Sequence, residues 1–443
     1  MNEIKKEEFL SIYKSELSLI GKLNSGGEKA LTFYKQNAFP TTKTEAWRDT
    51  DLNELFTEKL SDAPFFDLDK SFFESFEMPK TEMLRLVFVN GHFSETLSDT
   101  KEACDSLIIS DLNSAIRSNE SEVNQYFGKT NINLKNNFTA LNTAFAKNGS
   151  FILVKKNKEV KKLIHLIYLT DGRKSSAFSQ VRNLIVLGEN SKASILESYV
   201  SLSSSRIVSN FVSEVFMKQG SNLEFYRYQV ENENDFLITN THIEHEANSH
   251  LQQFIFSMSG KLIRNDVLVN INGEGSTNQT NGLSLADKTQ HFDNSIQLIH
   301  AKPNCNSKQL FKSLIDNEAT CVFNGKVLVA EDAQKTNAMQ SNKNILLTET
   351  ATARSKPQLE IYADDVACSH GSTTGQIDTE ALFYMQARGL GKQQARALLL
   401  FAFAAEVAAT IKNEAVKEWI ENLIDKRLRG RNITRECKHV FFK

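Results

Sequence analysis

Apolar and polar positions change their spacing along the chain. From about Phe151, short runs of Val, Ile, Leu and Phe are separated by Gly, Asn and Ser. Short apolar runs between turn-forming residues are typical of β-strands. Helical spacing is nearly absent from here until Asp378. The pattern predicts strands at 184–187, 195–200, 211–217, 223–228, 251–256 and 267–271.

The turns between these strands recur at a near-constant interval. Five turn segments align on a serine, and neighbouring serines lie 27 to 31 residues apart. Stacked coils of a solenoid leave such a period, because each coil repeats the same corner. A β-sandwich with long hairpins is the alternative that the period alone leaves open. The aligned residues are Ser191, Ser221, Ser249, Ser276 and Ser307.

The N-terminal third is predicted to be mostly helical. Pro40 interrupts the helical spacing and is followed by a polar segment around Trp47. One short strand is predicted at 84–89, where an Asn-Gly turn closes it. Apolar residues recur at helical spacing over 7–19, 27–34, 112–126 and 138–146.

Helical spacing returns near the C-terminus. Asp378 or Thr379 can cap a helix that runs to Arg388. Further helices are predicted at 392–412 and 414–427 after a tight Gly-Leu-Gly turn. The first of these two is apolar around most of its circumference, which predicts burial on more than one side. The chain thus divides into a mostly helical region (1–147), a β-solenoid core (148–376) and a helical region (377–443).

Composition and charge exclude several classes of protein. Apolar residues make up 40% and charged residues 24%, as in globular proteins, and the net charge is −2. Without a positive field, no general nucleic-acid or membrane-surface binding is expected. No run of about 18 uncharged apolar residues occurs, and the first residues lack the apolar stretch of a secretory signal. We therefore expect a cytoplasmic protein.

Cysteine spacing and missing motifs narrow the chemistry further. No CxxC pair occurs, so reduced thiols are expected, and a closed four-thiolate cluster or zinc site within this chain is not. GxxxxGKS/T, GxSxG and a strand-to-helix GxGxxG are also absent. We therefore expect no catalytic activity of its own. The widely spaced cysteines are Cys104, Cys305, Cys321, Cys368 and Cys437.

Three histidines lie close together in sequence. His242, His245 and His250 form HExxxH, one residue longer than the HExxH zinc motif, and they lie in a strand context. On a strand, His242 and His245 project from opposite faces. The spacing therefore favours a solvated face of the solenoid over a metal site.

The most informative segment is 359–376, LEIYADDVACSHGSTTGQ. Cys368 and His370 are two residues apart, so on an extended chain they project on the same side. A thiolate with an imidazole suits iron or zinc, but two ligands cannot complete a four-coordinate site. Either the pair is incidental, or a partner chain supplies the remaining ligands.

Three segments resemble the family of SufB and SufD proteins, scaffold subunits of iron–sulfur cluster assembly. Segment 356–390 is similar to the C-terminal signature of the SufD branch, and 322–347 to the block before it. Segment 39–52, FPTTKTEAWRDTDL, is similar to the family element PTxxxExWxxTDL. Cys368-Ser369-His370-Gly371 favours the SufD branch, because the SufB branch has an acidic residue and His-Glu-Ala there.

The resemblance implies a fold, partners and site residues. It implies a right-handed parallel β-helix flanked by N-terminal and C-terminal helical regions, in a scaffold of one SufB, two SufC ATPases and one SufD. The last coils of SufB and SufD would meet, with His370 facing a SufB cysteine and Cys368 beside it. Iron or an iron–sulfur cluster would bind there only transiently. A homodimer is left open. The hairpin that would dock into SufC comprises Arg388, Gly389, Leu390, Gly391, Lys392 and Gln393.

Two other functions remain to be weighed. A SufB-type scaffold would itself accept sulfur and hold the nascent cluster, but this chain lacks clustered cysteines. A solenoid carbohydrate enzyme would need convergent carboxylates on adjacent coils. Asp364 and Asp365 are adjacent in sequence and would point to opposite faces.

Overall fold

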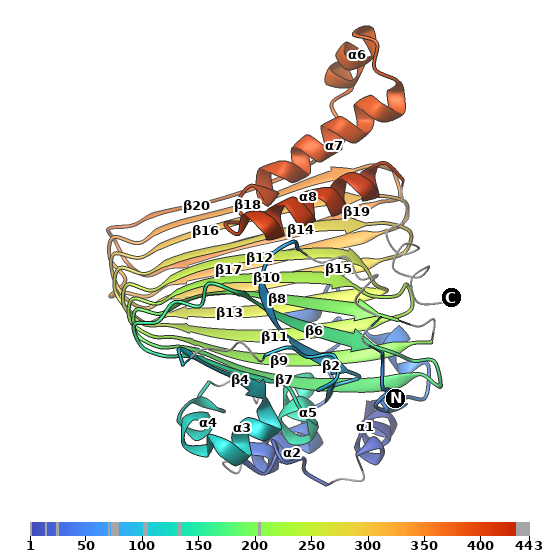
Figure 1. The fold of residues 1–443 in the computed structure, drawn as a ribbon. Helices are drawn as coiled ribbons and strands as arrows, with labels where there is room; N and C mark the ends of the chain where they lie inside the picture. Colours follow the sequence, from blue (N-terminus) through green and yellow to red (C-terminus); the bar gives the residue numbers. More distant parts are fainter. Residues whose placement is uncertain are drawn as a thin grey trace.

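The centre of the molecule is a parallel β-solenoid (Figure 1). The computed structural model describes residues 2–13, 16–23, 26–69, 71, 79–100, 105–130, 135–202 and 205–430. From residue 150 onwards, successive strands enter two facing sheets alternately, so each strand pairs with the strand two positions away along the chain. No helix within the described ranges is long and apolar enough to cross a bilayer.

The two sheets contain all of the described strands. Sheet 1 comprises β4 (Leu107–Asp111), β5 (Ser150–Val154), β7 (Ala177–Leu187), β9 (Ile207–Met217), β11 (Phe236–His245), β13 (Leu262–Ile271), β15 (His291–His300), β17 (Thr320–Val329) and β19 (Thr352–Ile361), with β1 (Ser61–Asp62) paired to β7. Sheet 2 comprises β2 (Met83–Val89), β3 (His92–Phe93), β6 (Leu163–Thr170), β8 (Lys192–Ser201), β10 (Asn222–Val230), β12 (His250–Ser259), β14 (Thr277–Ala286), β16 (Asn306–Ile315), β18 (Asn337–Leu346) and β20 (Ala367–Gly375).

Parallel pairing confirms the predicted β-helix. Every pairing among strands β5 to β20 is parallel, whereas hairpins of a sandwich would pair antiparallel. Antiparallel pairs are found only near the start of the described solenoid, between β2 and β3 and between β4 and β5. The β-sandwich alternative is therefore wrong.

A column of small, buried residues turns the same corner in successive coils. The register pairs Thr277 with Asn306, so Cys305, and not Ser307, follows Ser276 in this column. The prediction was wrong at this coil because the corner requires a small buried side chain rather than a serine. The column comprises Ser191, Ser221, Ser249, Ser276, Cys305 and Thr336.

The residue before each corner adopts a left-handed backbone conformation. Asn and Gly reach this region most easily, because an Asn side chain bonds locally and Gly has no Cβ. This is why Asn and Gly punctuate the apolar runs of the sequence. The residues with positive φ here are Asn190, Gly220, Asn248, Gly275, Asn304 and Lys335.

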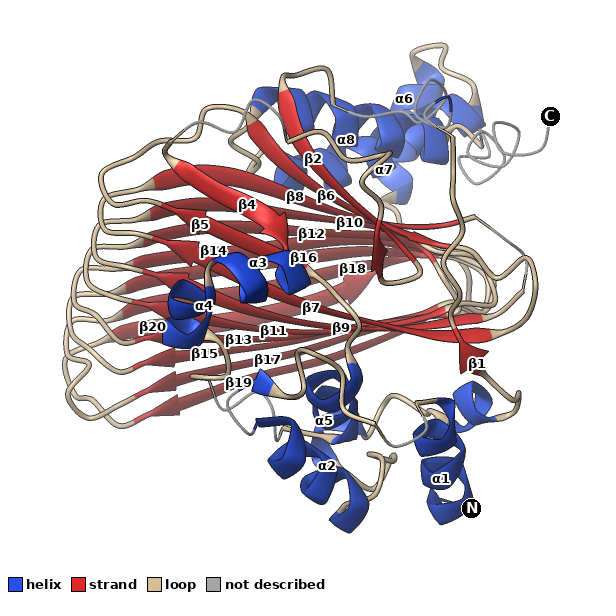
Figure 2. Cartoon of the chain, turned by 60° about the horizontal axis from the view of Figure 1, so that its bottom comes forward, coloured by secondary structure: helices blue, strands red, loops and turns tan. Residues whose placement is uncertain are grey.

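The N-terminal helices cover the outer face of the first coils of sheet 1 (Figure 2). The Asn142 amide of α5 (Asn137–Phe145) donates to the carbonyl oxygens of Val181 and Asn210, which ties this helix to β7 and β9. The predicted helix 7–19 is shorter in the structure and ends at Ile12. The helices are α1 (Asn2–Ile12), α2 (Gly26–Gln36), α3 (Leu112–Ser118), α4 (Glu120–Tyr126) and α5 (Asn137–Phe145), with short 3₁₀ turns at Glu45–Trp47 and Asn53–Phe56.

The C-terminal helices are α6 (Thr379–Ala387), α7 (Lys392–Ala408) and α8 (Glu414–Leu428). The Asp378 carboxylate accepts from the backbone N–H groups of Glu380 and Ala381, which confirms it as the cap of α6. Helix α8 lies over the outer face of sheet 2 and packs Trp419 against Tyr228, with ring centroids 4.8 Å apart (Figure 1). Val416, Trp419, Ile420 and Leu423 are all buried there.

Helix α7 is not buried evenly along its length. Leu400 is buried against sheet 2, but Leu398 is 37% exposed. The first half of α7 projects with α6 beyond the solenoid, as Figure 1 shows. Helix α7 as a whole packs against α6, α8 and sheet 2, as expected, but its first half leaves apolar surface exposed.

Candidate functional site

The last coil, β19 and β20, forms one end of the solenoid. Among the described strands, β19 pairs only with β17, and β20 pairs only with β18. Each strand therefore presents one edge of unpaired backbone N–H and C=O groups. Unpaired edges of this kind are ready to pair with another chain.

Cys368 and His370 lie side by side at this end. The register places Cys368 over Ala338 and His370 over Gln340, and both of these β18 residues are buried inside the solenoid. The same-side prediction is thus confirmed, and both side chains face the open interior. Cys368 is partly buried against the core, whereas His370 is exposed.

The surroundings of the pair are sparse in charge. Burial raises the pKa of the Cys368 thiol, which favours its protonated form at neutral pH. Beside His370, the Ser372 hydroxyl lies 2.9 Å from that of Ser355 and joins the two strands of the last coil. No cluster of three or more His, Cys, Asp or Glu side chains with metal-binding geometry occurs in the described part of the chain. Within the described residues, the pair alone therefore offers too few ligands to hold a metal ion.

The histidine cluster proves to be structural. His242 is buried on the outer face of sheet 1, where its Nε2 lies 2.9 Å from Asn270 Nδ2 and 2.9 Å from Glu244 Oε1. His245 points inward, and its Nδ1 lies 3.0 Å from Ser249 Oγ. Burial lowers the pKa of His245 to about 3, so this ring is neutral. The predicted solvated face is wrong for His242 and His245, because both side chains are buried.

His250 alone of the three is exposed. Its Nδ1 lies 2.7 Å from Thr277 Oγ1 on the next coil of sheet 2. The three rings thus occupy an outer face, the interior and a strand end, and they do not converge.

A segment of the N-terminal region crosses the outer face of sheet 1, and the sequence pattern did not predict it. We call residues 44–51 the strap. The Trp47 ring lies under the Arg264 guanidinium, 3.9 Å from ring centroid to Cζ, and the carbonyl oxygen of Ala46 accepts from Arg264 at 2.8 Å. Thr50 donates to Asp293 on the next coil. These contacts explain why an aromatic residue lies in an otherwise polar segment.

The strap also reaches the last coil. The Asp49 carboxylate accepts from Arg354 at 3.0 Å and pairs with Lys356, both on the outer face of β19. In the sequence, this contact is indicated by two basic residues, Arg354 and Lys356, that lie two positions apart on a strand. No sequence pattern connects them to an aspartate at the other end of the chain.

The C-terminal hairpin is exposed. In α6, Phe383 is 73% and Tyr384 59% exposed, and the Arg388 guanidinium lies over the Tyr384 ring. The segment from Arg388 to Gln393 lies at the tip of the hairpin and is largely exposed. The predicted docking residues are thus accessible to a partner.

A buried lysine anchors the other half of α7 to the solenoid. The Lys312 side chain on β16 is fully buried, and its Nζ donates to the Phe403 carbonyl oxygen at 2.8 Å and pairs with Glu406. Glu406 also pairs with Lys343 of β18 at 3.1 Å. This network fixes the base of the hairpin while its tip stays free.

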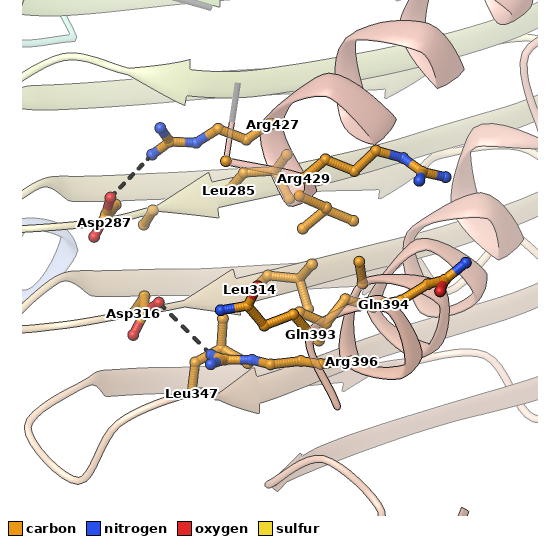
Figure 3. A pocket seen from close by; sticks show the side chains of 15 residues that line it. Leu285, Asp287, Leu314, Asp316, Leu347, Gln393, Gln394, Arg396, Arg427 and Arg429 are labelled. Atoms are coloured by element: carbon orange, nitrogen blue, oxygen red, sulfur yellow. Dashed lines mark hydrogen bonds and ion pairs between the residues drawn. The ribbon is translucent and has the colours of Figure 1, made fainter. Parts of the chain in front are cut away.

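A groove of about 820 Å³ lies between α7, the end of α8 and the strand ends of sheet 2 (Figure 3). Leucines form part of its lining, and Arg427 pairs with Asp287 at 3.3 Å and Arg396 with Asp316 at 3.8 Å. The opposite charges offset each other, so the groove carries no strong field for an ion.

Comparisons with known proteins agree with this architecture. Residues 168–403 match the family model "SUF system FeS cluster assembly, SufBD core domain", and residues 4–166 match "SufBD protein N-terminal region". An iron–sulfur cluster assembly SufBD family protein of Synechocystis is 32% identical over 377 residues, which cover 83% of each chain.

Two further relatives carry the names of the two branches. The iron–sulfur cluster assembly protein SufD of Escherichia coli is 29% identical and covers 89% of this chain and 90% of its own. The iron–sulfur cluster assembly protein SufB of Bacillus subtilis is 22% identical and covers 86% of this chain and 79% of its own. The fold, both family models and the full-length relatives lead to one conclusion: the chain belongs to the SufB/SufD family of iron–sulfur cluster assembly proteins.

Proposed function

We propose that this chain is a SufD-type, non-catalytic scaffold subunit that pairs with a SufB-type subunit and binds a SufC-type ATPase. The observation that carries the proposal is the incomplete Cys368–His370 pair at an open end of the solenoid. A partner at this end would complete the ligand set. Neither subunit alone would then hold the nascent cluster, so building it would depend on their assembly.

Unpaired strand edges support a partner of the same fold. Strands β19 and β20 offer parallel edges of 10 and 9 residues. A second solenoid whose end presents matching edges would satisfy these backbone groups by strand addition. The SufB-type relative aligns with this chain over most of its length, so its fold would suit this role.

His370 is the proposed contributor to the nascent cluster. Its exposed imidazole would supply one ligand to iron or move one proton, and Cys368 would be the second, less essential group. Iron is the substrate here. A bound cation would favour the thiolate form of Cys368 over the thiol form. Cysteine ligands would come from the partner.

The cysteines favour the SufD-type assignment over the SufB-type alternative. Burial raises the pKa of Cys305, and that of Cys321 to about 12, so both are protonated and unreactive. A scaffold that accepts sulfur needs an accessible thiolate. Within the described residues only Cys368 is partly exposed, while Cys104 and Cys437 lie outside them.

The exposed hairpin is the proposed ATPase contact. Phe383 and Tyr384 supply apolar surface, and Arg388 and Lys392 supply charge beside it. Exposed aromatic residues on a helix pair are stabilised when the groove of a partner buries them, which indicates a docking surface. The Lys312 anchor would carry force from the ATPase to the last coils of sheet 2.

Co-purification tests the proposal. This chain, tagged and co-expressed with SufB-type and SufC-type proteins, should retain both through size exclusion. If it retains neither, or if the purified chain alone hydrolyses ATP in a manner sensitive to its own substitutions, the proposal is wrong.

A further inference from the structure

An interior column of polar side chains leads to His370. In sheet 2, the register stacks Gln253 on Thr280, Thr280 on Gln309, Gln309 on Gln340 and Gln340 on His370. The first four are almost fully buried inside the solenoid. Burial of an amide side chain costs free energy unless the amide is hydrogen-bonded, so each of these amides should have hydrogen-bond partners.

Packing fixes the Gln340 side chain. Gln340 Nε2 donates to Gln309 Oε1 at 3.0 Å, on the coil below. Across the interior, Gly325 faces this amide, and a Cβ at that position would lie 2.1 Å from the Nε2 as it is placed here. Gln340 is therefore held between Gln309 and Gly325.

The same contacts leave one amide atom unsatisfied. Gln340 Oε1 is buried and has no hydrogen-bond partner among the described residues. Its Nε2 is directed to the coil below, so the carbonyl oxygen remains as the acceptor for a donor on the next coil. In stacked parallel strands, amide side chains bond from one rung to the next in this way.

His370 is the residue on that next rung. Its backbone pairs with Gln340, and parallel strands lie about 4.8 Å apart, a spacing that a ring N–H and an amide oxygen can bridge. Other polar groups nearby are already engaged, since Ser372 bonds Ser355 and Asn344 bonds Asn342. No described side chain hydrogen-bonds the His370 ring in this structure.

We propose that Gln340 is a positioning residue, whose Oε1 accepts the N–H of one His370 ring nitrogen. The other ring nitrogen is then unprotonated and faces out of the solenoid end. That is the tautomer and direction that a metal ligand needs, because coordination uses the free lone pair. The role in cluster building rests on the proposed function, whereas the tautomer does not.

The tautomer can be read directly in the isolated full-length chain. With selectively ¹⁵N-labelled histidine, a long-range ¹H–¹⁵N spectrum separates the two neutral tautomers, and the His370 signal is assigned by its loss in His370→Gln. We expect a single tautomer in the wild type. A ring that populates both tautomers in the wild type overturns the proposal without any further variant.

Three substitutions isolate the role of Gln340. Gln340→Met removes the acceptor at nearly constant volume and should produce a mixture of tautomers. Gln340→Glu retains an acceptor oxygen and should restore the single form. Gln253→Met removes a buried amide from the same column, four coils below His370, and should leave the His370 signal unchanged. If Gln340→Met also leaves it unchanged, the proposal is wrong.

Cluster assembly gives a separate measurement. Gln340→Met in the assembled complex should lower cluster formation about tenfold, the lower end of what loss of a partner behind a metal ligand costs. If Gln340→Met disturbs the tautomer but cluster formation persists even in His370→Ala, the positioning contact stands and the proposed function fails. If the tautomer is undisturbed while His370→Ala abolishes cluster formation, the function stands and the positioning contact fails.

Discussion

Asp49 lies 3.0 Å from Arg354, a residue 305 positions later in the chain. The contact joins the strap of the N-terminal region to β19, the last strand of sheet 1, which carries an unpaired edge. Between these points the strap contacts the intermediate coils through Trp47 and Thr50. The N-terminal region therefore helps to hold the end of the solenoid at which we place the partner.

Removal of the Asp49 charge should loosen the last coil. Asp49→Asn weakens the pairs with Arg354 and Lys356, which should cost about 1 kcal/mol, since Arg354 is partly exposed. Amides of β19 should then exchange with solvent about fivefold faster. Hydrogen exchange followed by mass spectrometry measures this. Glu45→Gln, an exposed change in the same strap, should leave β19 unchanged, and equal effects of both variants would contradict the account.

Acid should weaken the outer face of sheet 1. Burial raises the pKa of Asp266, but the charges of Lys135 and Arg264 outweigh it and lower that pKa from 3.8 to about 2. A depressed carboxyl pKa stabilises the fold above the unfolded value, and this stability is lost as pH falls from about 4 towards 2.

Asp266→Asn should remove this acid dependence. It should also lower the free energy of unfolding by about 3–5 kcal/mol at neutral pH, because the charge of buried Arg264 is then less well compensated. Urea midpoints measured from pH 7 to pH 2 test both points. Asp332→Asn, at an exposed turn, serves as the matched control. A pH profile of Asp266→Asn that runs parallel to that of the wild type would refute the assignment.

Charge reversal at the hairpin tip should weaken ATPase binding. Arg388→Glu combined with Lys392→Glu should lower affinity for a SufC-type partner at least about tenfold, since like charges across an interface cost more than 1 kcal/mol. The melting temperature should not change, because both residues are exposed. Calorimetric titration gives the affinity. Lys155→Glu with Lys158→Glu, at an exposed turn after β5, should bind as the wild type does, and undiminished binding by the hairpin variant would count against the docking surface.

Much of the fold follows from local pattern. The corner period predicted a solenoid because each coil needs a small residue and a left-handed turn at the same place, as Ser221 after Gly220 illustrates. The same rule failed at Ser307, because a serine two positions into the strand imitates the corner that Cys305 occupies. Local chemistry alone cannot set a register, which depends on how neighbouring coils pair.

The site was predictable only in part. The two-residue spacing of Cys368 and His370 places them on one face of any strand, and the structure bears this out. What lies beneath them depends on pairing with β18, so no local signal indicated Gln340. Burial of His242 likewise depends on neighbouring coils and not on its own sequence context. The strap depends on contacts between residues far apart in the chain. The charge pattern alone is compatible with too many ion pairs to predict which ones form.

The central claim is tested most directly by His370→Ala in cells whose iron–sulfur clusters depend on this assembly system alone. Because His370 is exposed, the variant should melt as the wild type does and co-purify with its SufB-type and SufC-type partners, yet the activity of a reporter iron–sulfur enzyme should be lost. Cys368→Ala should reduce that activity less, since the partner can supply thiolates. Normal reporter activity in His370→Ala would contradict the claim, and loss of complex formation would show that His370 is a structural residue instead.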